Sequence, residues 1–162
     1  MKIAVGCDHL GLSLKSEILS LLQERGIPCQ DFGVGPDQRV DYPDIAERVA
    51  EAILSGGFDR GILFCGTGIG MAISANKMPG IRAAVVHDPY SAERSRKSND
   101  AQVLTMGASV IGPKVARNLV SIWLDSEFQG GESARKVQKI EQLEGKFRSA
   151  AHRDTLMKVP WP

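Results

Sequence analysis

Residues 62–77 read Ile62-Leu63-Phe64-Cys65-Gly66-Thr67-Gly68-Ile69-Gly70-Met71-Ala72-Ile73-Ser74-Ala75-Asn76-Lys77. The apolar run that stops at Cys65 predicts a buried strand, and the stretch rich in Ala, Ile and Met after it predicts a helix. Three glycines in a Gly-x-Gly-x-Gly spacing join them, so we expect a tight turn between the two elements. The stretch therefore predicts a strand–loop–helix unit with a thiol at the start of the loop.

A loop of this kind can bind an anion. Gly66, Gly68 and Gly70 have no Cβ, so a ligand can approach their backbone amides closely. The amides of a helix's first turn lack intrahelical partners and lie at the positive end of the helix dipole, where they favour a phosphate or a developing oxyanion. The same field favours the thiolate form of Cys65. One short segment is thus expected to supply both a base and an oxyanion-binding loop.

Other interpretations of the loop are a tight packing turn and a nucleotide site. Gly-x-Gly turns often serve packing alone, and a cysteine is often buried as a plain hydrophobic residue. A Walker motif is excluded because no Gly-Lys-Ser/Thr follows the glycines. The dinucleotide fingerprint fits poorly, since the glycine spacing differs and no acidic residue follows about 20 positions later at a strand end.

Strand and helix patterns alternate along the rest of the chain. Apolar runs predict further strands at 2–7, 27–32, 81–87 and 101–106, and apolar stripes at helical spacing or polar helix-forming stretches predict helices around 14–22, 45–53, 90–97 and 115–123. Five strands with intervening helices predict an α/β fold, a three-layer α/β/α sandwich around a five-stranded parallel, Rossmann-like sheet.

Residues 132–147 predict a charged amphipathic helix with Val137, Ile140, Leu143 and Phe147 on one side. After a complete α/β unit, such a helix commonly packs on a second subunit, so we predict a homodimer. The alternative is that it covers the chain's own sheet. We assign residues 1–148, with this helix, to a single domain and residues 149–162 to an extended tail.

Composition narrows the class of protein. The formal charge of +1 over 162 residues gives no indication of a nucleic-acid or anionic-membrane partner. Cys7, Cys29 and Cys65 are widely spaced without a Cys-x-x-Cys motif, which favours a reducing compartment over a disulfide framework or a zinc site. The start reads as a strand rather than a signal peptide, and no apolar run approaches the about 18 residues of a membrane span. We expect a cytoplasmic protein.

Several ionisable residues follow strands of the predicted sheet. In parallel sheets, ligands bind beyond the carboxyl ends of the strands. Asp8 and His9 follow the first strand, Cys65 the third and His87 the fourth, so we expect them on one rim. The alternative for Asp8 and His9 is a helix cap beside a surface histidine.

Over about residues 1–148 the chain resembles the ribose-5-phosphate isomerase B family, which includes galactose- and allose-phosphate isomerases. The resemblance rests on motifs in the family's order and spacing: Gly6-Cys7-Asp8-His9, Asp41-Tyr42-Pro43, Cys65-Gly66-Thr67-Gly68-Ile69-Gly70, Ala75-Asn76-Lys77, Gly80-Ile81-Arg82-Ala83, Tyr90-Ser91-Ala92, Asn99-Asp100-Ala101 and Phe128-Gln129-Gly130-Gly131.

The resemblance implies an aldose–ketose isomerase that uses neither metal nor cofactor. Cys65 would move a proton between neighbouring carbons of a phosphorylated sugar through a cis-enediolate. The roles implied for other residues are Thr67 in the catalytic pocket, Gly66, Gly68, Ile69 and Gly70 as amide donors to the oxyanion, and Asp8, His9, Tyr42 and Asn99 as substrate contacts. It also implies a homodimer or tetramer with sites shared between subunits.

The chain departs from the family at several positions. Ser98 replaces the histidine that opens the sugar ring, Ser109 replaces an arginine after the fifth strand, and Glu132 and Lys136 replace two arginines that bind the phosphate. Lys136, Arg135 and Arg39 are the remaining candidates for phosphate binding. His87 is a candidate for the missing acid, with a surface histidine as its alternative.

These departures leave the substrate open among three interpretations. The first is the ribose 5-phosphate/ribulose 5-phosphate pair. The second is a tetrulose 4-phosphate/tetrose 4-phosphate pair such as erythrulose 4-phosphate, because a four-carbon 4-phosphate cannot close to a furanose and needs no acid at Ser98. The third is a binding protein that has lost the chemistry, against which the retained Cys65 argues.

Overall fold

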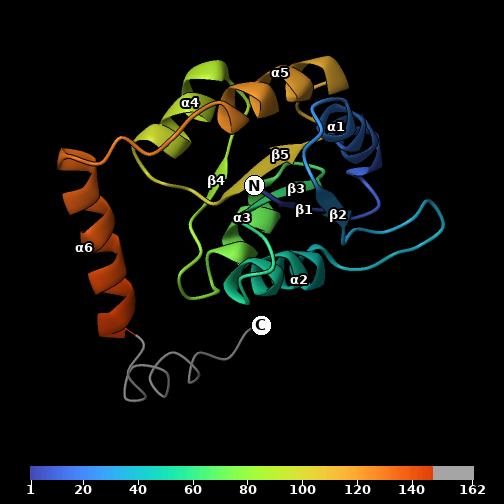
Figure 1. The fold of residues 1–162 in the computed structure, drawn as a ribbon. Helices are drawn as coiled ribbons and strands as arrows, with labels where there is room; N and C mark the ends of the chain where they lie inside the picture. Colours follow the sequence, from blue (N-terminus) through green and yellow to red (C-terminus); the bar gives the residue numbers. More distant parts are fainter. Residues whose placement is uncertain (148–162) are drawn as a thin grey trace.

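The computed structural model describes residues 1–147, which form three layers around a parallel sheet (Figure 1). The strands are β1 (Ile3–Cys7), β2 (Cys29–Asp31), β3 (Arg60–Cys65), β4 (Ala83–Val85) and β5 (Val103–Gly107). Their order across the sheet is β2-β1-β3-β5-β4, and every neighbouring pair is parallel. The predicted α/β/α sandwich with a five-stranded sheet is confirmed.

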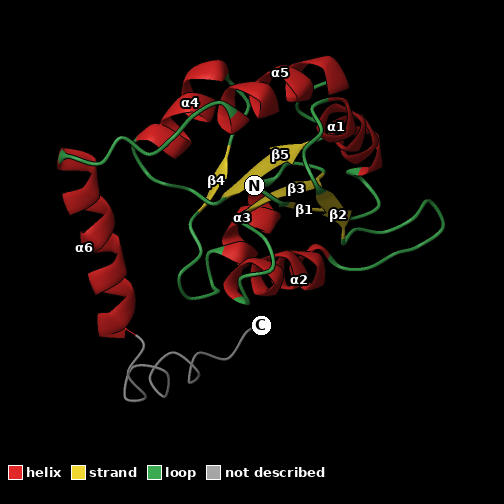
Figure 2. Ribbon diagram, in the orientation of Figure 1, coloured by secondary structure: helices red, strands yellow, loops and turns green. Residues whose placement is uncertain are grey.

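Helices cover both faces of the sheet (Figure 2). The helices α1 (Leu12–Glu24), α4 (Pro89–Lys97) and α5 (Pro113–Leu124) lie on one face, and α2 (Tyr42–Leu54) and α3 (Ile69–Ala75) lie on the other. Because both faces are covered, β1, β3 and β5 are buried along their whole length.

The two edge strands are shorter than the sequence predicts. The runs predicted at 27–32 and 81–87 form strands only at Cys29–Asp31 and Ala83–Val85. Each edge strand has a neighbour on one side only, so it ends where that single ladder ends. Hydrophobicity continues past this point because the flanking residues still pack against the core, as Val86 does with 1% of its surface exposed.

The strand order determines where a ligand crevice can form. From β1 the chain moves outward to β2 on one side, and from β3 it moves to the edge strand β4 on the other side and returns to β5 between them. Cys7, at the end of β1, is in register with Phe64, next to the end of β3. The strand order therefore changes direction between β1 and β3. Open parallel sheets bind ligands at the carboxyl ends of the two strands that flank such a point.

The helix α6 (Glu132–Phe147) has the predicted bounds and projects beside the sandwich (Figure 1). The Glu144 carboxylate accepts the Gly80 N–H at 3.0 and 3.1 Å. Val137 is buried, but Ile140 and Leu143 are 45% and 55% exposed. The alternative that α6 covers its own sheet is therefore wrong. The predicted tail at 149–162 lies outside the described residues.

Within residues 1–147, every helix is too short or too polar to span a membrane.

Candidate active site

A cavity of about 440 Å³ opens at the carboxyl ends of β1 and β3. It is formed by the loops that follow these strands and by the first turns of α2 and α3. The residues that line it are Asp8, Leu10, Tyr42, Cys65, Gly66, Thr67, Ile69, Gly70 and Ile73. All of them except Leu10 and Ile73 are site residues predicted from the sequence.

Cys65 is the last residue of β3 and forms part of the cavity wall, although only 5% of its surface is exposed. Its Sγ accepts the backbone N–H of Gly68 at 3.0 Å. Gly68 has a left-handed conformation with φ of +78°, which a residue with a Cβ adopts only with strain. The glycine thus allows the chain to turn back so that an amide donor faces the sulfur.

The backbone of β5 and the residues after it hold the Cys65 loop in place. The N–H groups of Ala108 and Ser109 donate to the carbonyls of Cys65 and Gly66, both at 2.9 Å. The hydroxyl of Thr105 donates to the carbonyl of Gly68 at 2.9 Å. The amides of the loop are therefore fixed before a ligand arrives, which is the condition for effective oxyanion stabilisation.

Asp8 both accepts hydrogen bonds from its own loop and lines the cavity. Its buried carboxylate accepts the N–H groups of Leu10 and Gly11 at 2.9 and 3.2 Å, as in the capping alternative, and it also lines the cavity. His9 is half-buried next to it and does not line the cavity. The Nδ1 of His9 is buried and has no hydrogen-bond partner within residues 1–147.

Tyr42, the first residue of α2, and Thr67, in the loop after Cys65, both line the cavity. A Cβ at Gly70 would lie 2.6 Å from Cε2 of Tyr42, so the aromatic ring can pack on the loop only because residue 70 is glycine. The Thr67 hydroxyl accepts the N–H of Ile69 at 3.3 Å and is exposed. Both residues border the cavity as predicted.

The cavity contains little charge of its own. Asp8 is the one charged residue in its lining, and the three candidate cations Arg39, Arg135 and Lys136 are exposed and lie outside the lining. Residues 1–147 contain no cluster of three or more His, Cys, Asp or Glu side chains arranged to hold a metal ion. The lining of this protomer's cavity therefore offers an anion backbone amides but no cationic side chain.

Asn99 and Ser98 are not brought together with Cys65 in the protomer. Asn99 lines a different cavity of about 250 Å³, together with Arg82 and Ile140 among others, at the amino ends of β4 and β5. Ser98 precedes it, and its hydroxyl contacts the guanidinium of Arg94. The two residues thus lie at the end of the sheet opposite the Cys65 cavity.

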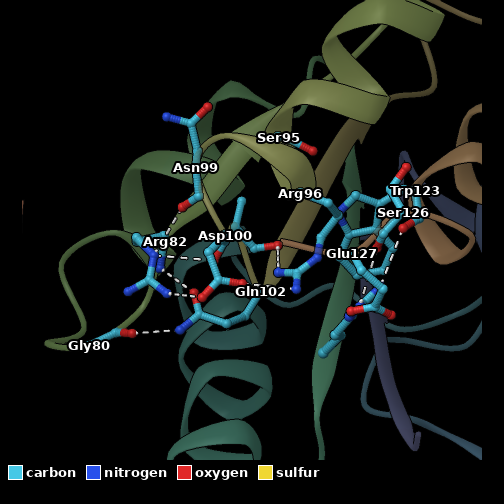
Figure 3. A network of polar contacts seen from close by, with 12 residues as sticks. Gly80, Arg82, Ser95, Arg96, Asn99, Asp100, Gln102, Trp123, Ser126 and Glu127 are labelled. Atoms are coloured by element: carbon cyan, nitrogen blue, oxygen red, sulfur yellow. Dashed lines mark hydrogen bonds and ion pairs between the residues drawn. The ribbon is translucent and has the colours of Figure 1, made fainter. Parts of the chain in front are cut away.

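A network of charged side chains holds the turn that carries Asn99 (Figure 3). Asp100 has a φ of +47°, and its carboxylate pairs with Arg96 at 2.9 Å and with Arg82 at 3.0 Å. Arg82 Nε also donates to the carbonyls of Asn99 and Asp100 at 3.2 and 3.1 Å. Figure 3 shows the Asn99 amide pointing away from this network, so the turn presents that side chain outward.

His87 lies outside the lining of the Cys65 cavity. Its Nε2 accepts the N–H of Gly107 at 2.9 Å. Burial lowers the pKa of His87 below its ordinary value, and the negative charge of Asp88 opposes this shift. The geometry supports neither the ring-opening acid nor the plain surface histidine considered from the sequence.

The sequence model described as Ribose/Galactose Isomerase matches residues 3–140. The chain belongs to this family. A relative from Listeria innocua named ribose-5-P isomerase B is 55% identical over 148 residues, which cover 91% of this chain and 100% of the relative. A relative from Pectobacterium atrosepticum named D-erythrulose-4-phosphate isomerase is 51% identical over 145 residues, 89% of this chain and 95% of the relative.

The solved structures of the ribose/galactose isomerase family share the fold. Ribose-5-phosphate isomerase B from Clostridium thermocellum superimposes with a TM-score of 0.88 at 50% identity, covering 91% of this chain and 99% of that chain. The resemblance noted from the sequence motifs is thereby confirmed.

Two cavity residues, Leu10 and Ile73, were missed by the sequence reasoning. Both are exposed, at 54% and 57%, and they add an apolar wall to the site. A signal for each was present. Leu10 follows Asp8-His9 in the same loop, and Ile73 lies four residues after Ile69, hence on the same helix face.

Proposed function

We propose that the chain is an aldose–ketose isomerase of phosphorylated sugars in which Cys65 is the base. Its thiolate removes the proton from the carbon beside the carbonyl, the C–H electron pair forms the enediolate double bond, and the carbonyl oxygen takes the negative charge. The S–H proton then returns to the former carbonyl carbon, the hydroxyl proton on the other carbon passes to the enediolate oxygen, and that other carbon becomes the new carbonyl. The observation that carries this proposal is the Cys65 sulfur in the cavity wall, 3.0 Å from the Gly68 amide nitrogen.

The loop at 66–70 supplies the second requirement, which is stabilisation of the enediolate oxygen. Gly66, Thr67, Ile69 and Gly70 bring backbone and hydroxyl groups to the cavity beside the sulfur. Helix N-terminal amides have no intrahelical acceptor and favour negative charge. A single donor of this kind contributes a factor of about 100 to 1,000 in turnover in enzymes that stabilise an oxyanion.

For the substrate, we propose the ribose 5-phosphate/ribulose 5-phosphate pair. It is supported by the name of the Listeria innocua relative. The alternative is erythrulose 4-phosphate, supported by the Pectobacterium atrosepticum relative and by Ser98 in place of the ring-opening histidine. In that substrate the 4-hydroxyl is esterified, so no furanose forms and no acid is needed to open it.

The site is proposed to be completed by a second copy of the chain. The protomer's cavity lacks a cation for the phosphate, while Asn99, Arg135 and Lys136 lie outside it. The exposed apolar face of α6 gives the second copy a surface to pack on. We propose that residues 1–148 act as one domain in this homodimer or tetramer. The three cysteines are unpaired, which favours a reducing compartment, and we expect the protein to act in the cytoplasm.

The test is turnover on a panel of four-, five- and six-carbon aldose and ketose phosphates with the wild type, Cys65→Ala and Cys29→Ala. Cys29 is a matched control because it lies in the edge strand β2, outside the cavity lining. We expect the wild type and Cys29→Ala to isomerise one pair and Cys65→Ala to lose turnover while still binding substrate. Binding without turnover by the wild type on every member would instead identify a sugar-phosphate-binding protein.

A further inference from the structure

His87 supplies a hydrogen-bond acceptor that the sheet itself lacks. The strand β4 ends at Val85, whereas its neighbour β5 continues to Gly107. The N–H of Val86 still donates to the Thr105 carbonyl at 3.0 Å. The next N–H of β5 that points toward β4 is that of Gly107, and only a longer β4 could provide a backbone acceptor for it. The Nε2 of His87 takes that place and accepts the Gly107 N–H at 2.9 Å. Without it, Gly107 would keep a partly buried donor without an acceptor, which is costly.

Gly107 is packed directly against the loop that follows Cys65. A Cβ at Gly107 would lie 2.6 Å from both Cα and C of Thr67 and 2.8 Å from the Gly66 carbonyl oxygen. The next two residues donate their N–H groups to the carbonyls of Cys65 and Gly66. Because backbone meets backbone here without an intervening side chain, a shift of Gly107 is passed on to the loop at 65–68.

We propose that His87 is a positioning residue of this enzyme, whose neutral imidazole holds Gly107 and thereby the loop that turns the Gly68 N–H toward the Cys65 sulfur. This inference rests on the proposed function for its activity readout. It also assigns the tautomer. Since Nε2 accepts a hydrogen bond, the imidazole proton is on Nδ1, and Nε2 is not available to donate a proton to a sugar.

Protonation removes the acceptor. An imidazolium has N–H groups at both ring nitrogens, so Nε2 can no longer accept from Gly107. The charged group facing His87 is Asp88 at the start of α4, whose Oδ1 accepts the Ser91 N–H at 2.8 Å. The strand β5, whose Gly107 N–H donates to the imidazole, contains no titratable side chain.

The direction of the pH effect follows from burial. Burial holds the pKa of His87 below its ordinary value of 6.5. The unfolded chain therefore binds the proton more readily than the folded one, so stability is complete above pH 6.5 and falls as the pH drops from there through the folded-state pKa. Any activity that depends on the hydrogen bond from the Gly107 N–H to His87 should fall over the same acidic pH range.

The experiment compares His87→Gln with His87→Ala. The Gln carboxamide oxygen reaches about as far as Nε2 and accepts a hydrogen bond without titrating, whereas Ala provides no acceptor. At pH 8 we expect His87→Gln to keep kcat within about twofold of the wild type and His87→Ala to lose about tenfold, the factor for one hydrogen bond. Below pH 6, His87→Gln should retain a larger fraction of its pH 8 activity than the wild type does.

A second readout needs no turnover. The rate at which iodoacetamide alkylates Cys65, followed by mass spectrometry of its peptide, should fall several-fold in His87→Ala and remain at the wild-type value in His87→Gln. If the wild type isomerises no sugar phosphate, the proposed function fails while this readout still tests the inference. The inference is overturned if His87→Ala matches the wild type in both readouts, or if His87→Gln is as inactive as His87→Ala, which would indicate proton transfer by the imidazole.

Discussion

At the scale of single residues, two cysteines at the ends of neighbouring strands differ in their access to the cavity. Cys7 ends β1 and Cys65 ends the neighbouring β3. Cys7 is completely buried, and burial raises its pKa to about 11. Cys65 lines the cavity, and its sulfur accepts an amide N–H. The residues that follow also differ: after Cys65 the Gly-x-Gly-x-Gly loop brings the Gly68 N–H to the sulfur, whereas after Cys7 the Asp8 carboxylate accepts N–H groups of its own loop.

The contact of Gly107 with the loop yields a prediction for Gly107→Ala. The new Cβ would meet the Thr67 backbone at 2.6 Å, and backbone cannot rotate away as a side chain can. We expect the free energy of unfolding to fall by about 1–3 kcal/mol. Turnover should fall by about 100-fold, since a shift of about 1 Å at a reacting group has an effect of this size.

Gly112→Ala is the control for this prediction, because nothing lies within 4 Å of a Cβ there. Both variants are compared by urea denaturation and steady-state kinetics. Equal stability and equal kcat for the two variants would show that the backbone contact at Gly107 does not constrain the loop.

At the scale of elements, helices could be predicted more closely than strands. The amphipathic pattern alone gave the bounds of α6, because helix hydrogen bonds are local. The strands predicted at 27–32 and 81–87 were too long, since a strand's length depends on a neighbour that is distant in sequence. For the same reason the sequence could not give the strand order. The position of Asn99 at the opposite end of the sheet from Cys65 does follow from the sequence, because Asn99 precedes a strand of a parallel sheet whereas Cys65 ends one.

The turn between α4 and β5 yields a prediction for Asp100. Asn tolerates a left-handed backbone but carries no charge, so Asp100→Asn should leave the buried Arg96 without this counter-charge and lower the free energy of unfolding by about 2 kcal/mol. Asp100→Ala adds the strain of a positive φ and should lose about 1 kcal/mol more. Urea denaturation of both variants tests this order, and an Ala variant at least as stable as the Asn variant would contradict it.

At the scale of the whole molecule, the proposed site is divided between two ends of the protomer. The lining of the Cys65 cavity contains the proposed base and the proposed oxyanion-binding loop but no cation, whereas Asn99 lies at the opposite end of the sheet with its side chain pointing outward. The sequence motifs predicted both halves because motifs record residue types. They could not say which halves meet, since that depends on packing between copies.

Subunit complementation tests whether the halves meet. Cys65→Ala and Asn99→Ala are each expected to be inactive alone. If a site takes Cys65 from one copy and Asn99 from the other, random pairing of the two variants gives half mixed dimers, each with one intact site, and about a quarter of wild-type activity. Co-expression with two different affinity tags isolates the mixed species. Activity in the mixed species no higher than in the parents would place each whole site within one protomer.

The most direct test of the mechanism is solvent hydrogen exchange followed by NMR. In deuterium oxide, with ribose 5-phosphate or erythrulose 4-phosphate, the wild type should place deuterium on the carbon beside the carbonyl, because the proton passes through the Cys65 sulfur. Cys65→Ala should show none above the enzyme-free rate, while Cys29→Ala should match the wild type. Deuterium incorporation by Cys65→Ala at the wild-type rate would contradict the assignment of Cys65 as the base.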